Sequence, residues 1–354
     1  MKLNKIALAI CLVSFNLYAT DLVYSANQNG NTVSVVDANT YKNVGSLILG
    51  YPAGDKRLYS PLYNGEINVH GLSYAKKRRE LSVVSTVTNS VTRFDTNTGK
   101  KIDTIYVGRN PHEPRYTNNE DEIWVTVRGE NYVSIIDSQN GKEKKRIVLE
   151  SGPGMVTFSH DDKYAYISSS FDGHLWIVDT KTKKIIKKIM MPSSFSPFIN
   201  TTPDGKEVWV DHKDVGEITR ISTESNEIIE TFKTGKISNH FAFANNKAYV
   251  TVGGENSVNV YNYGEKHAKL IKKIPAETLP HGIWADTKGR KVYFVNELSD
   301  TLQVIDAYSD RIIAKSSVGA LPQALVYAEN ATDNLDEMIK NISHTPEFRE
   351  PKNK

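Results

Sequence analysis

Four of the nine histidines in this chain recur at one position of a repeat of about 42 residues. They are His70, His112, His240 and His281, and three further repeats carry Gly154, Phe198 and Gln323 at the same position. At the average histidine frequency of the chain, seven positions would hold only about 0.2 histidines. If the repeats are blades of one ring, all seven positions face its axis from the same side. Neutral imidazole is the commonest protein ligand for metals, so the pattern predicts a bound metal or cofactor.

Further polar residues are expected on the same face, because the turn after the second strand of each repeat ends there. Arg128 and Lys213 in these turns can pair with carboxylates of a substrate or of a haem-like macrocycle. Glu113 and Arg115 follow His112 closely enough to orient a ligand. The predicted metal ligands are His70, His112, His240, His281 and His212, the last reaching in from the repeat that carries Phe198. The predicted cofactor contacts are Arg128, Lys213, Gln323, Glu297, Glu113 and Arg115.

Each of these residues also has a purely structural interpretation. A single histidine at a strand entry can be satisfied by a backbone carbonyl, and a charged turn residue can simply be solvated. A shift of one residue in strand register would also turn the imidazoles away from the axis. Recurrence alone does not separate the two interpretations, because the aspartates that close the third strands recur as well and fit turn caps. A turn does not require an imidazole side chain, however, and the residue type therefore favours a ligand-binding site.

The elements that position these residues are short antiparallel strands. The clearest repeat has strands at 280–285, 291–295, 301–306 and 311–317, and four such strands per 40 to 45 residues are typical of a β-propeller blade. The chain starts out of phase: 22–27, 32–37 and 43–49 match strands two to four, and the missing first strand is at 322–327. We therefore predict an all-β, seven-bladed propeller of four-stranded antiparallel blades, closed by a blade shared between the two termini.

Three segments lie outside the regular repeat. Residues 1–19 read as a signal peptide, 20–328 as the propeller, and 329–354 as a tail whose Leu335, Met338, Ile339 and Ile342 predict a short amphipathic helix capped at Thr332 or Asp333. We expect that helix to pack on the propeller, with docking onto a partner as the alternative. The 18-residue connection from Gly50 to Val69, which contains Tyr51, Lys56, Arg57, Tyr59 and Tyr63, is a candidate lid on the histidine face.

The N-terminus predicts export to the periplasm. Lys2 and Lys5 precede the apolar run 6–15, and cleavage after Ala19 would remove Cys11, the only cysteine. The rest of the chain would carry a net charge of about +1, no thiol and no membrane span. The near-neutral charge argues against a nucleic-acid partner.

The segments 24–37, 124–137 and 248–252 resemble the YVTN repeat, and the resemblance covers about residues 21–328. It implies a YncE-like seven-bladed propeller, whose wider relatives include the d1-type haem domain of periplasmic nitrite reductases and the copper propeller of nitrous oxide reductase. The resemblance suggests copper, iron or a d1-type haem as the cofactor. Unlike those relatives, this chain lacks a companion electron-transfer domain.

We therefore expect a periplasmic accessory or carrier protein for redox metabolism that binds a metal or small molecule at the mouth of the propeller, with a periplasmic protein as a possible partner. One alternative is a YncE-like module that binds a peptide, glycan or cell-wall ligand on the same face. Another is a lyase or hydrolase that uses a histidine with Glu297 or Glu113. The sequence leaves open whether the protein is an enzyme and favours binding.

Overall fold

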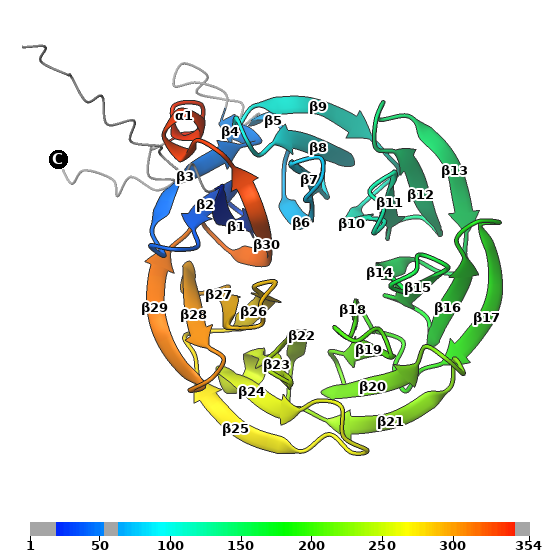
Figure 1. The fold of residues 1–354 in the computed structure, drawn as a ribbon. Helices are drawn as coiled ribbons and strands as arrows, with labels where there is room; N and C mark the ends of the chain where they lie inside the picture. Colours follow the sequence, from blue (N-terminus) through cyan, green and yellow to red (C-terminus); the bar gives the residue numbers. More distant parts are fainter. Residues whose placement is uncertain (1–18, 53–62, 344–354) are drawn as a thin grey trace, which may run out of the picture.

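The computed structural model describes residues 19–52 and 63–343, and these form seven four-stranded antiparallel sheets around a central axis (Figure 1). The predicted seven-bladed propeller is thus confirmed. Within each blade the first strand lies innermost and the fourth lies on the outside of the ring.

Six blades are continuous in the sequence. The first three are β6–β9 (Val69–Ala75, Glu80–Ser85, Ser90–Asp95, Lys101–Tyr106), β10–β13 (Pro111–Tyr116, Glu122–Val127, Tyr132–Asp137, Glu143–Val148) and β14–β17 (Pro153–Phe158, Tyr164–Ser169, His174–Asp179, Lys184–Met190). The next three are β18–β21 (Phe198–Thr201, Glu207–His212, Glu217–Ser222, Ile228–Lys233), β22–β25 (Ser238–Ala244, Lys247–Val252, Ser257–Asn262, Leu270–Pro275) and β26–β29 (Pro280–Ala285, Lys291–Asn296, Thr301–Asp306, Arg311–Ser317).

The seventh blade is assembled from both ends of the propeller, as the sequence predicts. β1 (Thr20–Asn27) pairs with β2 (Thr32–Asp37), which pairs with β3 (Asn43–Ile48). On its other side β1 pairs antiparallel with β30 (Pro322–Thr332), so that Tyr24 lies opposite Val326 (Figure 1). This pairing closes the ring and covers the inner edge of β1.

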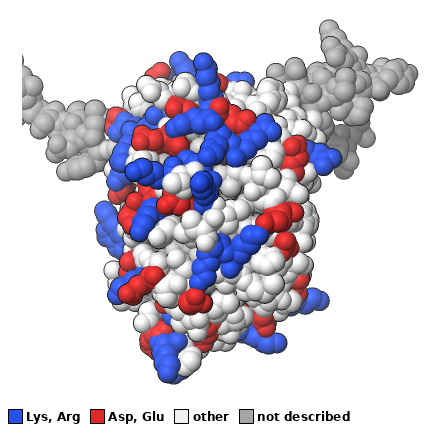
Figure 2. Space-filling model, turned by 90° about the vertical axis from the view of Figure 1, so that its right-hand side faces the viewer, with Lys and Arg blue, Asp and Glu red and all other residues white. Residues whose placement is uncertain are grey.

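The burial of the strands decreases outward, and their sequences reflect this. Inner second strands such as β11 are almost wholly buried, because neighbouring blades cover both faces, and they read as continuous apolar runs. The outer strand β13 is exposed at five of its six residues and carries Lys144, Lys145 and Arg146. Figure 2 shows basic and acidic side chains interleaved over the side formed by such outer strands. Charged residues on an outermost strand discourage edge-to-edge association.

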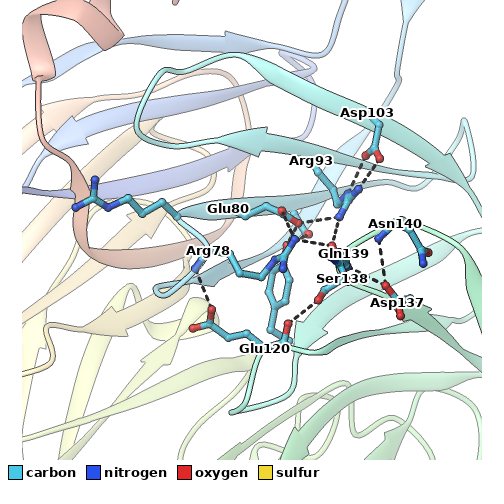
Figure 3. A network of polar contacts seen from close by, with 12 residues as sticks. Arg78, Glu80, Arg93, Asp103, Glu120, Asp137, Ser138, Gln139 and Asn140 are labelled. Atoms are coloured by element: carbon cyan, nitrogen blue, oxygen red, sulfur yellow. Dashed lines mark hydrogen bonds and ion pairs between the residues drawn. The ribbon is translucent and has the colours of Figure 1, made fainter.

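Buried arginines tie together the outer part of two blades (Figure 3). Arg93 on β8 is only 2% exposed, and its Nη1 donates to Glu80 Oε1 at 3.1 Å while its Nε donates to Asp103 Oδ1 at 2.8 Å. The same Nη1 also donates to the carbonyl of Ser138 in the next blade. Arg220 occupies the equivalent position on β20 and pairs with Glu207 and Glu230 in the same way.

The C-terminal tail packs on the propeller, as expected. α1 (Leu335–Ile339) is short, and Met338 is fully buried in the core formed by the split blade and its neighbour. The cap differs from the prediction: Asn334, and neither Thr332 nor Asp333, accepts a hydrogen bond from the backbone N–H of Glu337. Thr332 is still the last residue of β30, and this excludes it from the cap position.

Only part of the connection between Gly50 and Val69, which the sequence predicts to be a lid, lies within the described residues. β4 (Gly50–Pro52) and β5 (Tyr63–Gly65) form a two-stranded hairpin, while Lys56, Arg57 and Tyr59 lie outside the described residues, as do the signal segment and Cys11. No helix in the described part of the chain is long and apolar enough to cross a bilayer.

Candidate functional site

The structure brings the four recurring histidines together around the axis. The rings of His70 and His112 are 4.6 Å apart between centroids, and those of His240 and His281 are 4.9 Å apart. Phe198 stacks on His240 with a centroid distance of 4.1 Å. Neighbouring positions of the ring therefore contact each other, which the 42-residue spacing predicts. We call this end of the propeller the histidine mouth.

The imidazoles of the histidine mouth differ in their hydrogen bonding. His112 Nδ1 lies 2.9 Å from the carbonyl oxygen of Gly154 in the next blade. Because a carbonyl only accepts, Nδ1 must carry the proton, which leaves Nε2 of the neutral ring as an acceptor. In contrast, Nδ1 of His70 and Nδ1 of His281 are buried and make no hydrogen bond of normal geometry: His70 neighbours the backbone of His112, and His281 Nδ1 lies 3.3 Å from Glu297 Oε2.

Two cations face these imidazoles. Arg128 follows β11 and Lys213 follows β19, and both are only partly exposed. Within the described residues neither cation lies within ion-pair distance of a carboxylate, and Arg128 Nε is buried without a partner. Burial lowers the pKa of Arg128 to about 10 and also lowers the pKa of Lys213. In the described residues the site therefore holds two positive charges with no carboxylate at ion-pair distance, while Glu113 acts on Arg128 and Glu297 and Asp211 act on Lys213 from further away.

Burial, followed by the charges of Arg128 and Lys213, lowers the pKa of His70 to about 3. Burial likewise lowers the pKa values of His112, His240 and His281 well below their usual range. All four imidazoles are therefore neutral at physiological pH. Within the described residues, the positive charges that act on these imidazoles are those of Arg128 and Lys213.

The rim next to His281 is the acidic side of the mouth. His281 Nδ1 lies 3.3 Å from Glu297 Oε2, and Gln323 is a hydrogen-bonding neighbour of both side chains. Burial raises the pKa of Glu297. Glu297 and Gln323 are thus placed with the histidines, as the sequence predicts.

Glu113 lies deeper, between two blades. Its carboxylate accepts from the backbone N–H of Leu72, and burial raises its pKa to about 8 in spite of Arg115 and Arg128. Gly71 makes room for it, because a Cβ at Gly71 would lie 1.9 Å from Glu113 Oε2. Position 71 therefore requires glycine because Glu113 occupies the space of a Cβ, and the repeat pattern does not reveal this requirement.

Two predicted residues lie elsewhere. His212 is fully buried within its blade, where Nδ1 lies 2.7 Å from Ser196 Oγ and Nε2 lies 2.7 Å from Thr219 Oγ1. Both nitrogens are occupied, so the prediction that His212 reaches the mouth is wrong. Arg115 lies at the far end of β10, where its Nη2 donates to Asn200 Oδ1 at 3.2 Å and its guanidinium covers Trp284 at 5.2 Å. It therefore cannot orient a ligand at His112.

Sequence reasoning missed one buried acid. Asp211 is fully buried beside Lys213 and accepts a hydrogen bond from Ser238 Oγ at 2.5 Å. Burial raises the pKa of Asp211 to about 8, and Ser238 and Lys213 oppose that shift. The sequence does contain a signal for this buried acid, because Asp211 stands near the end of an otherwise apolar second strand.

Residues 166–340 match the model of the family described as YNCE-like beta-propeller. The chain is a YncE-like β-propeller. No curated protein sequence matches it.

Solved structures show the same fold at low sequence identity. A protein of unknown function from Desulfotomaculum acetoxidans is 12% identical, with 87% of this chain and 99% of that chain covered and a TM-score of 0.72. The periplasmic gluconolactonase of Pseudomonas aeruginosa is 15% identical (88% and 99% covered, TM-score 0.68). Hydrazine synthase of Kuenenia stuttgartiensis is 18% identical (80% and 97% covered, TM-score 0.66). These likenesses concern the fold alone.

The described residues offer no set of side chains that could coordinate the predicted metal. Among the described residues, no group of three or more His, Cys, Asp or Glu side chains is arranged to hold a metal ion. The histidines form two separate pairs, and a pair alone needs further ligands. Copper, iron and a d1-type haem stay predictions.

The neutral histidines make the stability of the propeller depend on pH. The pKa of His70 is about 3 in the folded state and 6.5 as a reference value, so between these values the unfolded state binds more protons. The free energy of unfolding should therefore fall as pH falls through this window, by at most about 1.4 kcal/mol per pH unit for each histidine. In His70→Gln the slope measured by urea unfolding at several pH values should be shallower than in the parent chain. Phe198→Leu, at a ring position where neither side chain titrates, should give a curve parallel to the parent, and a parallel curve for His70→Gln would contradict the prediction.

Proposed function

We propose that this YncE-like propeller is an exported binding protein that holds a small anionic molecule of the carboxylate class at the histidine mouth. The observation that carries the proposal is the pair of partly buried cations, Arg128 and Lys213, which lie beside neutral imidazoles and have no carboxylate at ion-pair distance among the described residues. A buried charge without a partner is costly, and an anion from solution would relieve that cost.

The surrounding groups suit a carboxylate ligand. The guanidinium of Arg128 can bind a carboxylate with two parallel hydrogen bonds, while Lys213 adds a point charge. The neutral imidazoles of His70 and His281 can each donate one hydrogen bond to the same ligand or to a bridging water. Glu297 on the acidic side would favour a ligand that also carries a hydroxyl or another donor group.

Export is part of the proposal. The predicted cleavage point after Ala19 coincides with the start of the fold, because β1 begins at Thr20. Removal of residues 1–19 would therefore leave every strand of the propeller intact. The mass of the protein recovered from the periplasm tests this point.

The binding proposal is tested by titrating the full propeller with citrate and with inorganic phosphate in a calorimeter. We expect citrate to bind, and the variants Arg128→Gln and Lys213→Gln each to weaken its binding by about 10- to 100-fold, because each removes a charge-assisted hydrogen bond. Lys236→Gln, an exposed lysine in the connection to β22, is the matched control and should bind like the parent. Binding that is absent in the parent, or unchanged in both variants, would refute the proposal.

A second measurement separates this proposal from the cofactor interpretation. The protein purified from its own source should show no visible absorption band and no metal in stoichiometric amount. A haem-like band, or one transition-metal ion per chain that is lost in His112→Ala and His281→Ala, would replace the organic anion by a cofactor.

A further inference from the structure

A cavity of about 490 Å³ lies at the end of the propeller opposite the histidine mouth. Its walls come mainly from the turns between the first and second strands of three consecutive blades, β18–β19, β22–β23 and β26–β27, with His160 of the β14–β15 turn and Tyr263 after β24 completing the lining. Because first strands begin at the histidine mouth, these turns must lie at the other end. The volume is in the range of roughly 300–1,000 Å³ that is usual for small-molecule sites. We call it the aromatic cavity.

The lining of this cavity differs from that of the histidine mouth. Phe243, Tyr263 and Trp284 contribute aromatic rings, and those of Phe243 and Tyr263 are in contact at 5.2 Å between centroids. Asp286 and Lys288 contribute one charge of each sign. The cavity thus combines apolar ring faces with a balanced charge, which favours a neutral ligand over an anion.

The amide of Asn200 is oriented as a donor. Its Oδ1 accepts from Arg115 Nη2 at 3.2 Å and from the backbone N–H of Thr201 at 3.0 Å. With the oxygen engaged twice, the Nδ2 hydrogens remain for a ligand. The same guanidinium covers the indole of Trp284, at 5.2 Å from its centroid. Arg115 is therefore a positioning residue that fixes two walls of the cavity at once.

We propose that the aromatic cavity binds one pyranose ring, either a free sugar or the terminal unit of a glycan. A pyranose has an apolar face of C–H groups, which can stack on Trp284, and a rim of hydroxyls that both donate and accept. Asn200 Nδ2 donates to one hydroxyl, and the carboxylate of Asp286 at the opposite wall can accept from another. This site is separate from the anion site and does not rest on it.

The test uses the full propeller and intrinsic tryptophan fluorescence, supported by calorimetry. Glucose, galactose, mannose, N-acetylglucosamine and short oligomers of each are titrated in turn. We expect at least one of these sugars to bind and Trp284→Leu to weaken its binding about tenfold or more, with partial rescue in Trp284→Phe. Equal affinity for the monomer and its oligomer indicates a free sugar, whereas a gain with the oligomer indicates a glycan end; either result supports the ring site.

A second variant guards against a folding artefact. Asn200→Ala removes the donor and should lower the affinity; because it also takes an acceptor from Arg115, the circular dichroism spectrum is recorded to verify that the fold is kept. Arg115→Met should lower the affinity for the sugar and leave the pH profile of binding unchanged, because it acts through Trp284 and Asn200. The proposal fails if none of the sugars binds, or if Trp284→Leu and Asn200→Ala bind as the parent does.

Discussion

A chain that ends at Leu321 is expected to give no soluble, cooperatively folded protein. This truncation removes β30, so that the apolar strand β1 becomes an open edge and the ring is no longer closed. It also removes the buried side chains of Leu325, Val326, Met338 and Ile342. At about 1.5–3 kcal/mol for each, their loss amounts to about 6–12 kcal/mol, which is comparable with the whole stability of a domain.

The matched control is a chain that ends at Thr332. It keeps every pairing between β1 and β30 and loses only α1 and the residues after it. We expect it to stay monomeric and cooperative, with a free energy of unfolding lowered by about 3–6 kcal/mol through the loss of Met338 and Ile342. Size-exclusion chromatography and urea unfolding distinguish the two chains. A monomeric chain ending at Leu321 with a native circular dichroism spectrum would show that closure is dispensable.

Replacing Arg93 with methionine is expected to lower the free energy of unfolding by about 3–5 kcal/mol. The substitution removes one of the two arginines that donate to both the buried carboxylate of Glu80 and the carbonyl of Ser138, and it frees Asp103 from its two hydrogen bonds (Figure 3). Arg78 and Tyr116 still contact Glu80, which keeps the cost from rising further.

Arg146→Met is the matched control for Arg93→Met, and urea unfolding measures both. Arg146 pairs with Glu143 at 2.8 Å, but the two side chains are 50% and 36% exposed. Such a pair contributes little, so a loss of about 1 kcal/mol or less is expected. Equal losses in the two variants would mean that the buried network does not stabilise the contact between blades.

The fold could be derived from the sequence because its information is local and repeated. Alternating apolar residues and turn residues at a 42-residue period locate the strands, and the phase of the first repeat reveals that β30 closes the ring. The capping residue of α1 was placed wrongly, because β30 continues further than its repeat equivalents and moves the cap to Asn334. The Arg93 and Arg220 networks could have been found, since each arginine has an acid at the same two repeat positions.

The positions of the site residues could be predicted from the sequence only in part. Residues at the start of first strands were placed correctly, because the repeat fixes both their position and the end of the propeller at which they lie. His212 and Arg115 were not, because their contacts depend on side-chain direction, which a repeat does not encode. His212 turns into its own blade, toward Ser196 and Thr219, and Arg115 sits at the end of β10 that is remote from His112.

Arg115 also links blades of the ring that are not neighbours. It starts on the first strand of one blade and contacts residues on the first strands of two others, Asn200 on β18 and Trp284 on β26. A side chain that joins three blades near the axis also fixes the spacing of strands that no hydrogen-bonded ladder connects. One arginine therefore braces the ring across its centre, in addition to the packing between neighbouring blades.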